Sequence, residues 1–194
     1  MIEKFTKQAI DICPSFSIDE SQEQYYRNLI YYFIKSDKCE WDLAKGLCIQ
    51  GNIGTGKTLS IKLCQRIFKG IKITPARHII REYMVEGAKI IDGYGRESFA
   101  KGNHGGSDFT KPINLCIDDL GLEEVNTKFY GNSANVISDI LLDRYDTFIT
   151  YGMLTHATTN LDSANMEKIY GSRVRDRLKE MMNQIVLIGE SKRK

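Results

Sequence analysis

The sequence predicts an α/β fold in which a parallel β-sheet is covered on both faces by helices. Short apolar segments of strand length alternate along the chain with longer segments whose apolar residues recur at helical spacing. A glycine-rich segment at 51–58 also joins one of the apolar strands to an amphipathic helix. Strands that alternate with helices pair in parallel, because each helix carries the chain back across one face of the sheet by a right-handed crossover.

Length and composition indicate one main domain. The chain has 194 residues, of which 42% are hydrophobic and 27% are charged, enough for one well-filled core but not for two large ones. The net charge of +2 gives no overall argument for nucleic-acid or membrane binding, so any such argument must be local. The five cysteines form no C-x-x-C pair and no zinc pattern, as expected of reduced thiols in the cytoplasm. The charged N-terminus, which no continuous apolar run follows, predicts neither a signal peptide nor a membrane anchor.

Residues 1–40 are expected to form an N-terminal helical segment, and residues 41–194 the core. Ser17 and Glu20 fit a capping box, and a strongly apolar, tyrosine-rich helix follows until the polar break at 36–38. We expect this apolar face to pack on the domain, with a partner-binding or base-stacking surface as the alternative.

The chain from 46 to 111 contains the first strands and helices of the predicted sheet. A strand at 46–50 leads through the glycine-rich segment into a helix that ends near residue 68, and a short strand follows at 71–73. Thr74 is predicted to cap the next helix, with Pro75 at its first position. Residues 87–111 show no regular pattern.

The chain after 111 continues the alternation of strands and helices. The expected elements are a strand at 113–117, a helix that Asn132 or Ser133 caps and that runs to about Tyr145, a strand at 152–157, helices near 163–169 and 172–182, and a final strand at 184–188.

Residues 51–58 have the G-x-x-x-x-G-K-T spacing of a phosphate-binding loop, between the strand and the helix that this motif requires. The glycines let the backbone curl so that successive N–H groups face one anion at a helix N-terminus. Lys57 would then reach the β- and γ-phosphates, and the Thr58 hydroxyl would hold Mg²⁺. A glycine-rich turn with a chance lysine is the alternative, but it would not explain the flanking strand and helix. The residues predicted to bind the nucleotide are Gly51, Asn52, Ile53, Gly54, Thr55, Gly56, Lys57, Thr58 and Leu59.

Two acids follow the apolar strand at 113–117. An Asp at the end of a neighbouring strand orders the Mg²⁺ shell in hydrolases with this loop, so we assign Asp118 to the metal. Asp119 is assigned as the general base that polarises an attacking water, because successive side chains of a strand point in different directions. A helix cap or a solvated loop start is the alternative for this pair.

Asn160 lies at the end of the next predicted strand, where its amide could hydrogen-bond the same water and the γ-phosphate without adding charge. The residues Thr159-Asn160-Leu161-Asp162 resemble a guanine-reading motif but lack its lysine, so we exclude a GTPase.

Three arginines alternate at the start of the helix expected at 172–182, and Arg173 and Arg177 are four residues apart on one face. An arginine that completes the site of a neighbouring subunit would stabilise the charge on a transferring phosphoryl group. A solvated basic face and contacts to nucleic-acid phosphates remain alternatives, because residues 168–194 contain eight Lys or Arg and only three acids.

Taken together, these residues resemble the AAA+ ATPases of the helicase-loader and transposase-helper family (DnaC/IstB-like), which are P-loop NTPases. The resemblance covers residues 41–190 in the right order. The matching segments are Gly51-Asn52-Ile53-Gly54-Thr55-Gly56-Lys57-Thr58, Ile117-Asp118-Asp119-Leu120-Gly121, Thr158-Thr159-Asn160 and Gly171-Ser172-Arg173-Val174-Arg175-Asp176-Arg177-Leu178.

The resemblance implies a five-stranded parallel sheet of order 5-1-4-3-2, no C-terminal lid domain, and ATP with Mg²⁺ as cofactors. It also implies hydrolysis in oligomers, with Arg177 in the place of the arginine finger, Arg173 as a second arginine, and Asn160 as the polar sensor. Asp119 stands where many AAA+ proteins have Glu, and its shorter side chain implies slow hydrolysis.

The function that the resemblance implies is a cytoplasmic, oligomeric, helicase-loader-like matchmaker in DNA replication. Its partners would be a replicative helicase or another DNA-processing protein, single-stranded DNA and further copies of itself, with no membrane. A transposase helper and a small nucleotide kinase are the alternatives. Residues 75–101 are nearly neutral in charge, which argues against the arginine-rich lid and acceptor pocket of a kinase.

Overall fold

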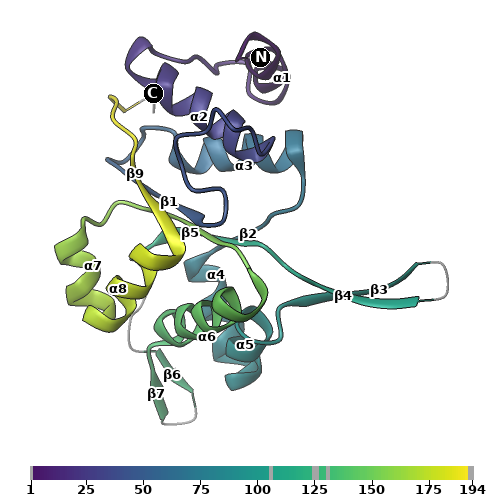
Figure 1. Cartoon of the computed structure of the whole chain (residues 1–194). Coiled ribbons are helices and arrows are strands. Elements are labelled where there is room, and N and C mark those ends of the chain that lie inside the picture. Colours follow the sequence, from purple (N-terminus) through teal and green to yellow (C-terminus); the bar gives the residue numbers. More distant parts are fainter. Residues whose placement is uncertain (1, 105–106, 124–126, 130–131, 192–194) are drawn as a thin grey trace.

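The computed structural model describes residues 2–104, 107–123, 127–129 and 132–191, and its centre is a five-stranded parallel sheet of order β2-β5-β8-β1-β9 (Figure 1). The five strands are β1 (Gly46–Gln50), β2 (Lys72–Pro75), β5 (Leu115–Leu120), β8 (Thr155–Thr159) and β9 (Met182–Val186). All four pairings between them are parallel. When these five strands are numbered 1 to 5 along the chain, their order across the sheet, read from β9, is 5-1-4-3-2. This confirms the predicted fold class and strand order.

Helices cover both faces of this sheet (Figure 1). The elements on one face are α1 (Ile2–Ile12), the 3₁₀ turn η1 (Glu20–Gln22), α2 (Glu23–Phe33) and α3 (Lys57–Phe68). Those on the other face are α4 (Ala76–Glu86), α5 (Ala88–Tyr94), α6 (Val136–Tyr151), α7 (Ser163–Tyr170) and α8 (Ser172–Met181). Strand β1 contributes to both cores, because Leu47 and Ile49 face α1–α3 whereas Cys48 faces the other layer.

The N-terminal helices share their buried cluster with α3 and β1. The rings of Tyr25, Tyr26 and Tyr32 are buried, as expected of a helix face that packs on the domain. The predicted capping box was wrong, because Glu20 begins η1 and α2 starts only at Glu23, without a side-chain cap. The division into two parts at residue 40 stays a prediction.

The predicted starts of two helices, α4 and α6, were wrong for identifiable reasons. Thr74 and Pro75 continue β2, where they pair with β5, so Pro75 precedes α4 as its N-cap and Thr74 makes no cap. Proline is tolerated there because β2 is an edge strand. Asn135, and not Asn132 or Ser133, caps α6: its side-chain oxygen accepts a hydrogen bond from Ser138 N at 3.2 Å.

Two β-hairpins lie outside the main sheet. Strands β3 (Phe99–His104) and β4 (Ser107–Pro112) pair antiparallel, and the hairpin extends away from the rest of the molecule (Figure 1). Strands β6 (Thr127–Phe129) and β7 (Asn132–Ala134) form the other pair. Residues 87–111, expected to be the least regular part of the chain, hold α5 and most of the β3–β4 hairpin.

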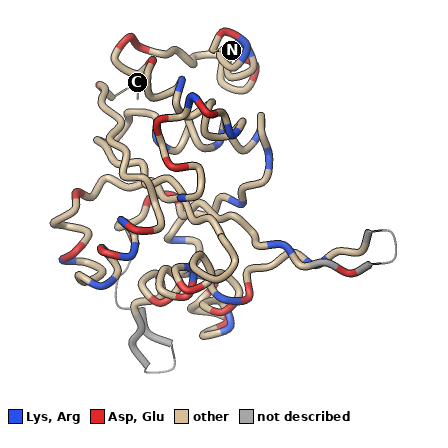
Figure 2. The backbone as a smooth tube through the Cα atoms, in the orientation of Figure 1, with Lys and Arg blue, Asp and Glu red and all other residues tan. Residues whose placement is uncertain are grey.

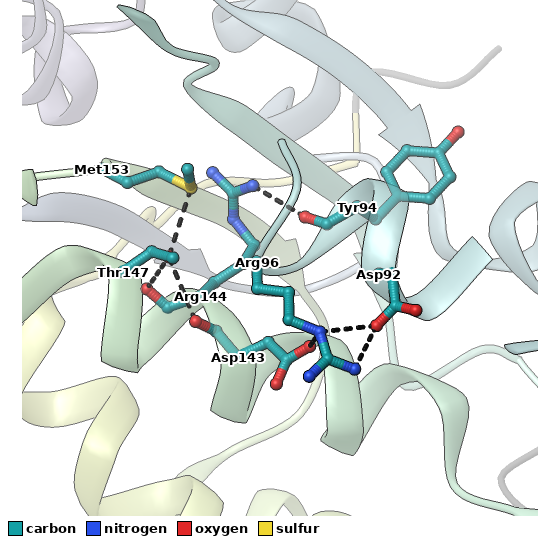
Figure 3. Close-up of polar contacts among 7 residues, drawn as sticks. All are labelled: Asp92, Tyr94, Arg96, Asp143, Arg144, Thr147 and Met153. Atoms are coloured by element: carbon teal, nitrogen blue, oxygen red, sulfur yellow. Dashed lines mark hydrogen bonds and ion pairs between the residues drawn. The ribbon is translucent and has the colours of Figure 1, made fainter. Parts of the chain in front are cut away.

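A buried arginine ties the second helical layer to the sheet. Arg144 on α6 is 0% exposed and donates to Tyr94 O at 2.8 Å, Thr155 Oγ1 at 2.6 Å and two further carbonyl oxygens (Figure 3 shows the Tyr94 contact). Burial lowers the pKa of its guanidinium to about 9. The two further acceptors are Ile113 O and Leu154 O, so one side chain connects α5 and α6 to the starts of β5 and β8.

Candidate nucleotide site

The predicted phosphate loop lies at the carboxyl end of β1 and runs directly into α3, whose first residue is Lys57. Gly54 and Gly56 have φ angles of 87° and 98°, the left-handed region that favours glycine. A Cβ at Gly54 would also lie 2.2 Å from Ser191 Oγ, so this position leaves no room for a side chain. The backbone conformation of the loop therefore requires both glycines. In this conformation the N–H groups at the start of α3 can face an anion.

Lys57 brings two parts of the predicted site together. Its ammonium donates to Gly51 O and Asn52 O at 2.8 Å each and to Asn160 Oδ1 at 2.6 Å. The side chain is buried among these neutral acceptors, with 5% exposure. Because loop carbonyls hold the cation at the mouth of the loop, a phosphate oxygen would compete with them for it.

The remaining loop residues divide into supporting and exposed positions. Thr55 is 1% exposed and its hydroxyl donates to Asn52 O at 3.0 Å, which braces the turn. Leu59 packs against the core of the first helical layer, whereas Ile53 is 60% exposed. We therefore expect Thr55 and Leu59 to shape the loop, and Ile53 to contribute only its backbone.

Thr58 and Asp118 meet, as predicted for residues that share a metal ion. Thr58 Oγ1 donates to Asp118 Oδ1 at 2.7 Å, and the carboxylate is 4% exposed. A hydroxyl and a carboxylate are oxygen donors of the kind that Mg²⁺ prefers, and Mg²⁺ usually takes few protein ligands beside water and phosphate oxygens. The two residues therefore fit this ion.

Asp119 departs from regular strand geometry. Its φ is 58°, and the register of β5 against β8 shifts between Ile117 and Leu120. A left-handed residue other than glycine costs about 1 to 2 kcal/mol, and such strain concentrates at functional sites. Among the described residues, no group donates a hydrogen bond to the Asp119 carboxylate, so it remains available to a water molecule.

Thr158 is a site residue that sequence reasoning did not single out. Its hydroxyl donates to Asp118 Oδ1 at 2.6 Å and accepts from Asp119 N at 2.9 Å. Thr158 therefore orients both acids from the neighbouring strand β8. The only sequence signal was its place in the Thr-Thr-Asn end of that strand.

A second group of unpredicted contacts lies behind the loop. The Gln22 side-chain amide, 1% exposed, donates to Thr55 O and to Ile188 O, at 3.3 Å each. Leu187 N donates to Gln50 O at 2.7 Å. The segment after β9 therefore runs beside the phosphate loop, and Gln22 of η1 connects the two by hydrogen bonds.

The stretch of sequence that contains the loop is basic. Residues 43–81 contain eight Lys or Arg and no Asp or Glu, whereas the rest of the chain is net negative (Figure 2).

The arginines do not reach the loop of their own chain. Arg177 on α8 lies 4.4 Å over the Tyr145 ring and 3.7 Å from Asp146, and Arg175 pairs with Glu167 and Asp176. Arg173 is exposed and makes no hydrogen bond or ion pair with the described residues. Helices α8 and α3 cover opposite faces of the sheet.

The fold and the loop geometry are those of the P-loop class of α/β proteins. Neither a protein-family model nor a curated protein matches the sequence. Among solved structures, the chain is similar to the DnaC helicase loader, with 17% identity, a TM-score of 0.57 and coverage of 96% of this chain and 99% of that one. It is also similar to DnaI, with 18% identity, a TM-score of 0.59 and coverage of 100% and 94%.

A third similar structure is the replication initiator DnaA bound to AMPPCP and single-stranded DNA, with 13% identity and a TM-score of 0.62. The alignment covers 91% of this chain and 49% of DnaA. The chain therefore has the AAA+ fold that these replication proteins share, and at such low identity the likeness concerns the fold. No helix among the described residues is long and apolar enough to span a bilayer.

Proposed function

We propose that this protein binds and hydrolyses ATP and acts in DNA replication as a helicase-loader-like matchmaker. One observation carries the proposal: the residues that the motif assigns to phosphate, metal and sensor meet at one point. Lys57 contacts Asn160, and Thr58 contacts Asp118, although each pair is separated by at least 60 positions in the sequence.

Each residue has a role in this proposal. Lys57 and the backbone N–H groups at 51–58 would bind the phosphates, and Asn160 would orient the attacked γ-phosphate. Thr58 and Asp118 would hold Mg²⁺, which, when bound, neutralises charge on the phosphates. Asp119 would accept the proton of the attacking water. Arg177, with Arg173, would complete the site of a neighbouring protomer.

The proposed partners follow from the proteins with the same fold. DnaC is a helicase loader, and the DnaA structure contains AMPPCP and single-stranded DNA. We therefore propose a replicative helicase and single-stranded DNA as partners, and self-association as the active state, in the cytoplasm.

The nucleotide part is tested by calorimetric titration with ATP and by phosphate release. Lys57→Ala is expected to abolish ATP binding, because it removes the only side-chain cation that the loop holds among the described residues. Asp119→Asn should retain binding and stop turnover. Lys62→Ala is the matched control: it removes an exposed lysine from the same helix and should change neither quantity. Wild-type protein that binds no ATP would contradict the proposal.

The matchmaker part is tested with Asp119→Asn protein, which should hold ATP unchanged. Single-stranded DNA binding is expected with ATP but not with ADP, and the affinity should fall steeply as salt increases. Affinity capture with the ATP-bound variant should retain a replicative helicase. A DNA affinity that depends on neither the bound nucleotide nor the salt concentration would argue against this role.

A further inference from the structure

A buried hydrogen-bonded contact links the acid pair to the arginine segment within one chain. The Tyr170 hydroxyl donates to Glu123 Oε1, and the other carboxylate oxygen, Oε2, accepts from Gly121 N at 2.8 Å. Tyr170 and Glu123 are 6% and 9% exposed. A buried carboxylate is expensive unless donors satisfy it, so these two donors fix where Glu123 can lie.

The two ends of this contact lie next to functional residues. Gly121 follows Asp119 by two positions, so the carboxylate holds the backbone at the turn that leaves the acid pair. Tyr170 is the last residue of α7, and α8 begins at Ser172 with Arg173 at its second position. Between them, Gly171 has a φ of 86°, so the chain turns sharply after Tyr170.

The turn after Asp119 is also tied to the strand that carries Asn160. Thr159 Oγ1 donates to Leu120 O at 2.7 Å. A Cβ at Gly121 would lie 2.3 Å from Leu161 Cδ1, so the turn packs directly on the residue that follows Asn160. A displacement of the acid pair or of Asn160 would therefore be expected to displace Gly121. Glu123, which contacts both Gly121 and Tyr170, would transmit it to the start of α8.

We propose that Glu123 and Tyr170 are positioning residues that set the arginine segment according to the nucleotide state of the same chain. This inference rests on the proposed function, in which the arginines act on the neighbouring protomer. Through the Glu123–Tyr170 contact, a protomer whose acid pair engages nucleotide presents its arginines in the productive position. The contact would thus couple successive sites in the oligomer.

The first experiment compares Tyr170→Phe and Glu123→Gln with wild type. Both substitutions keep side-chain size: Tyr170→Phe removes the donor hydroxyl, and Glu123→Gln removes the charge of the acceptor. We expect hydrolysis per protomer at high protein concentration to fall about tenfold, as for loss of one hydrogen bond to a charged group. ATP affinity should change little, whereas the unfolding midpoint should fall, because a buried carboxylate loses a donor or its charge. Tyr32→Phe is the control, because it also removes a buried hydroxyl, one that donates to Lys45 O at 2.5 Å.

The second experiment mixes variants to locate the defect. In the mixture of Tyr170→Phe with Asp119→Asn, the Tyr170→Phe protomer has an intact nucleotide site, and its Asp119→Asn neighbour holds ATP without turnover and supplies an intact arginine segment. Activity should therefore return in this mixture, as it should when Arg177→Ala is mixed with Asp119→Asn. Mixing Tyr170→Phe with Arg177→Ala should restore nothing, because both lack a working donor segment.

The outcomes separate this inference from the proposed function. Full activity of Tyr170→Phe and Glu123→Gln alone would overturn the inference. If Asp119→Asn protein rescues Arg177→Ala but does not rescue the loss in Tyr170→Phe, the inference is also overturned and the proposed function stays intact. If Arg177→Ala is not rescued either, the arginines do not act between protomers, and both proposals fail.

Discussion

At the scale of single residues, Thr158 places one hydroxyl between two acids with different proposed roles. It donates to the Asp118 carboxylate and accepts from the Asp119 backbone. Outer contacts of this kind orient a metal ligand, and their loss weakens metal binding. The geometry of Asp118 therefore depends on a side chain that would itself touch neither metal nor nucleotide.

Thr158→Val should weaken Mg²⁺-dependent nucleotide binding about 10- to 100-fold, because valine has the shape of threonine but cannot orient the acid. Calorimetric titration with nucleotide at increasing Mg²⁺ concentration measures this effect, and binding without Mg²⁺ should be unchanged. Thr147→Val is the control, since the acceptors within reach of that buried hydroxyl among the described residues are Asp143 O, Arg144 O and the Met153 sulfur (Figure 3). An equal loss in both variants would refute the assignment.

Residues whose chemistry follows from local spacing were predictable. The positions of Lys57 and Thr58 follow from the loop motif, and Asp118 follows from its place after an apolar strand. Thr158 and Gln22 were not predictable, because their contacts join residues that are 33 or more positions apart in the sequence. No local sequence pattern predicts which strand ends will be neighbours in the folded sheet.

At the scale of elements, α6 depends on the four hydrogen bonds that Arg144 donates to α5 and to the starts of β5 and β8. These acceptors are neutral, so the cation is stabilised by dipoles alone. β8 carries Thr158 near its other end and leads to Asn160. The arginine therefore anchors the strand that delivers two site residues.

Arg144→Met should lower the free energy of unfolding by about 3 to 5 kcal/mol, because it leaves several buried acceptors without donors. Urea denaturation measures this loss. Arg96→Met is the matched control: Arg96 pairs with Asp92 and lies near Asp143 at the surface, so its loss should change stability little (Figure 3). Similar losses in the two variants would show that the buried network is not the cause.

The order and type of the main elements were predictable, but several boundaries and both hairpins were not. The spacing of apolar residues in the sequence indicates these strands and amphipathic helices directly. The β3–β4 hairpin has mostly polar strands, so its sequence resembles that of a loop. The cap of α6 was placed too early for a related reason, since Asn132 and Ser133 lie in the short polar strand β7.

At the scale of the whole molecule, the phosphate loop and the arginine segment belong to opposite faces of the sheet. The contacts that Arg175 and Arg177 make within the described residues do not involve the loop. Arg177 already has partners in its chain, the Tyr145 ring and Asp146, whereas Arg173 has none among the described residues. Arg177 would have to exchange these contacts for a phosphate.

ATP hydrolysis per protomer should rise with protein concentration, because assembly completes the site. Arg177→Ala should remove this rise and lower the rate at high concentration by about 10³-fold, the effect of losing an arginine finger. Phosphate release over a concentration series measures it. Arg175→Ala is the control, since Arg175 is paired with Glu167 and Asp176 of its own chain. If Arg177→Ala behaves as wild type at every concentration, the arginine does not act between protomers.

The placement of loop and arginines on opposite faces gives any row of protomers two unlike ends. At one end, a bound triphosphate meets no guanidinium and stays uncleaved; at the other, a guanidinium meets no triphosphate. A closed ring has no such ends. In a single-turnover chase, an open spiral should therefore leave a fraction of its bound ATP unhydrolysed, and a closed ring should leave none. This fraction distinguishes a spiral from a ring.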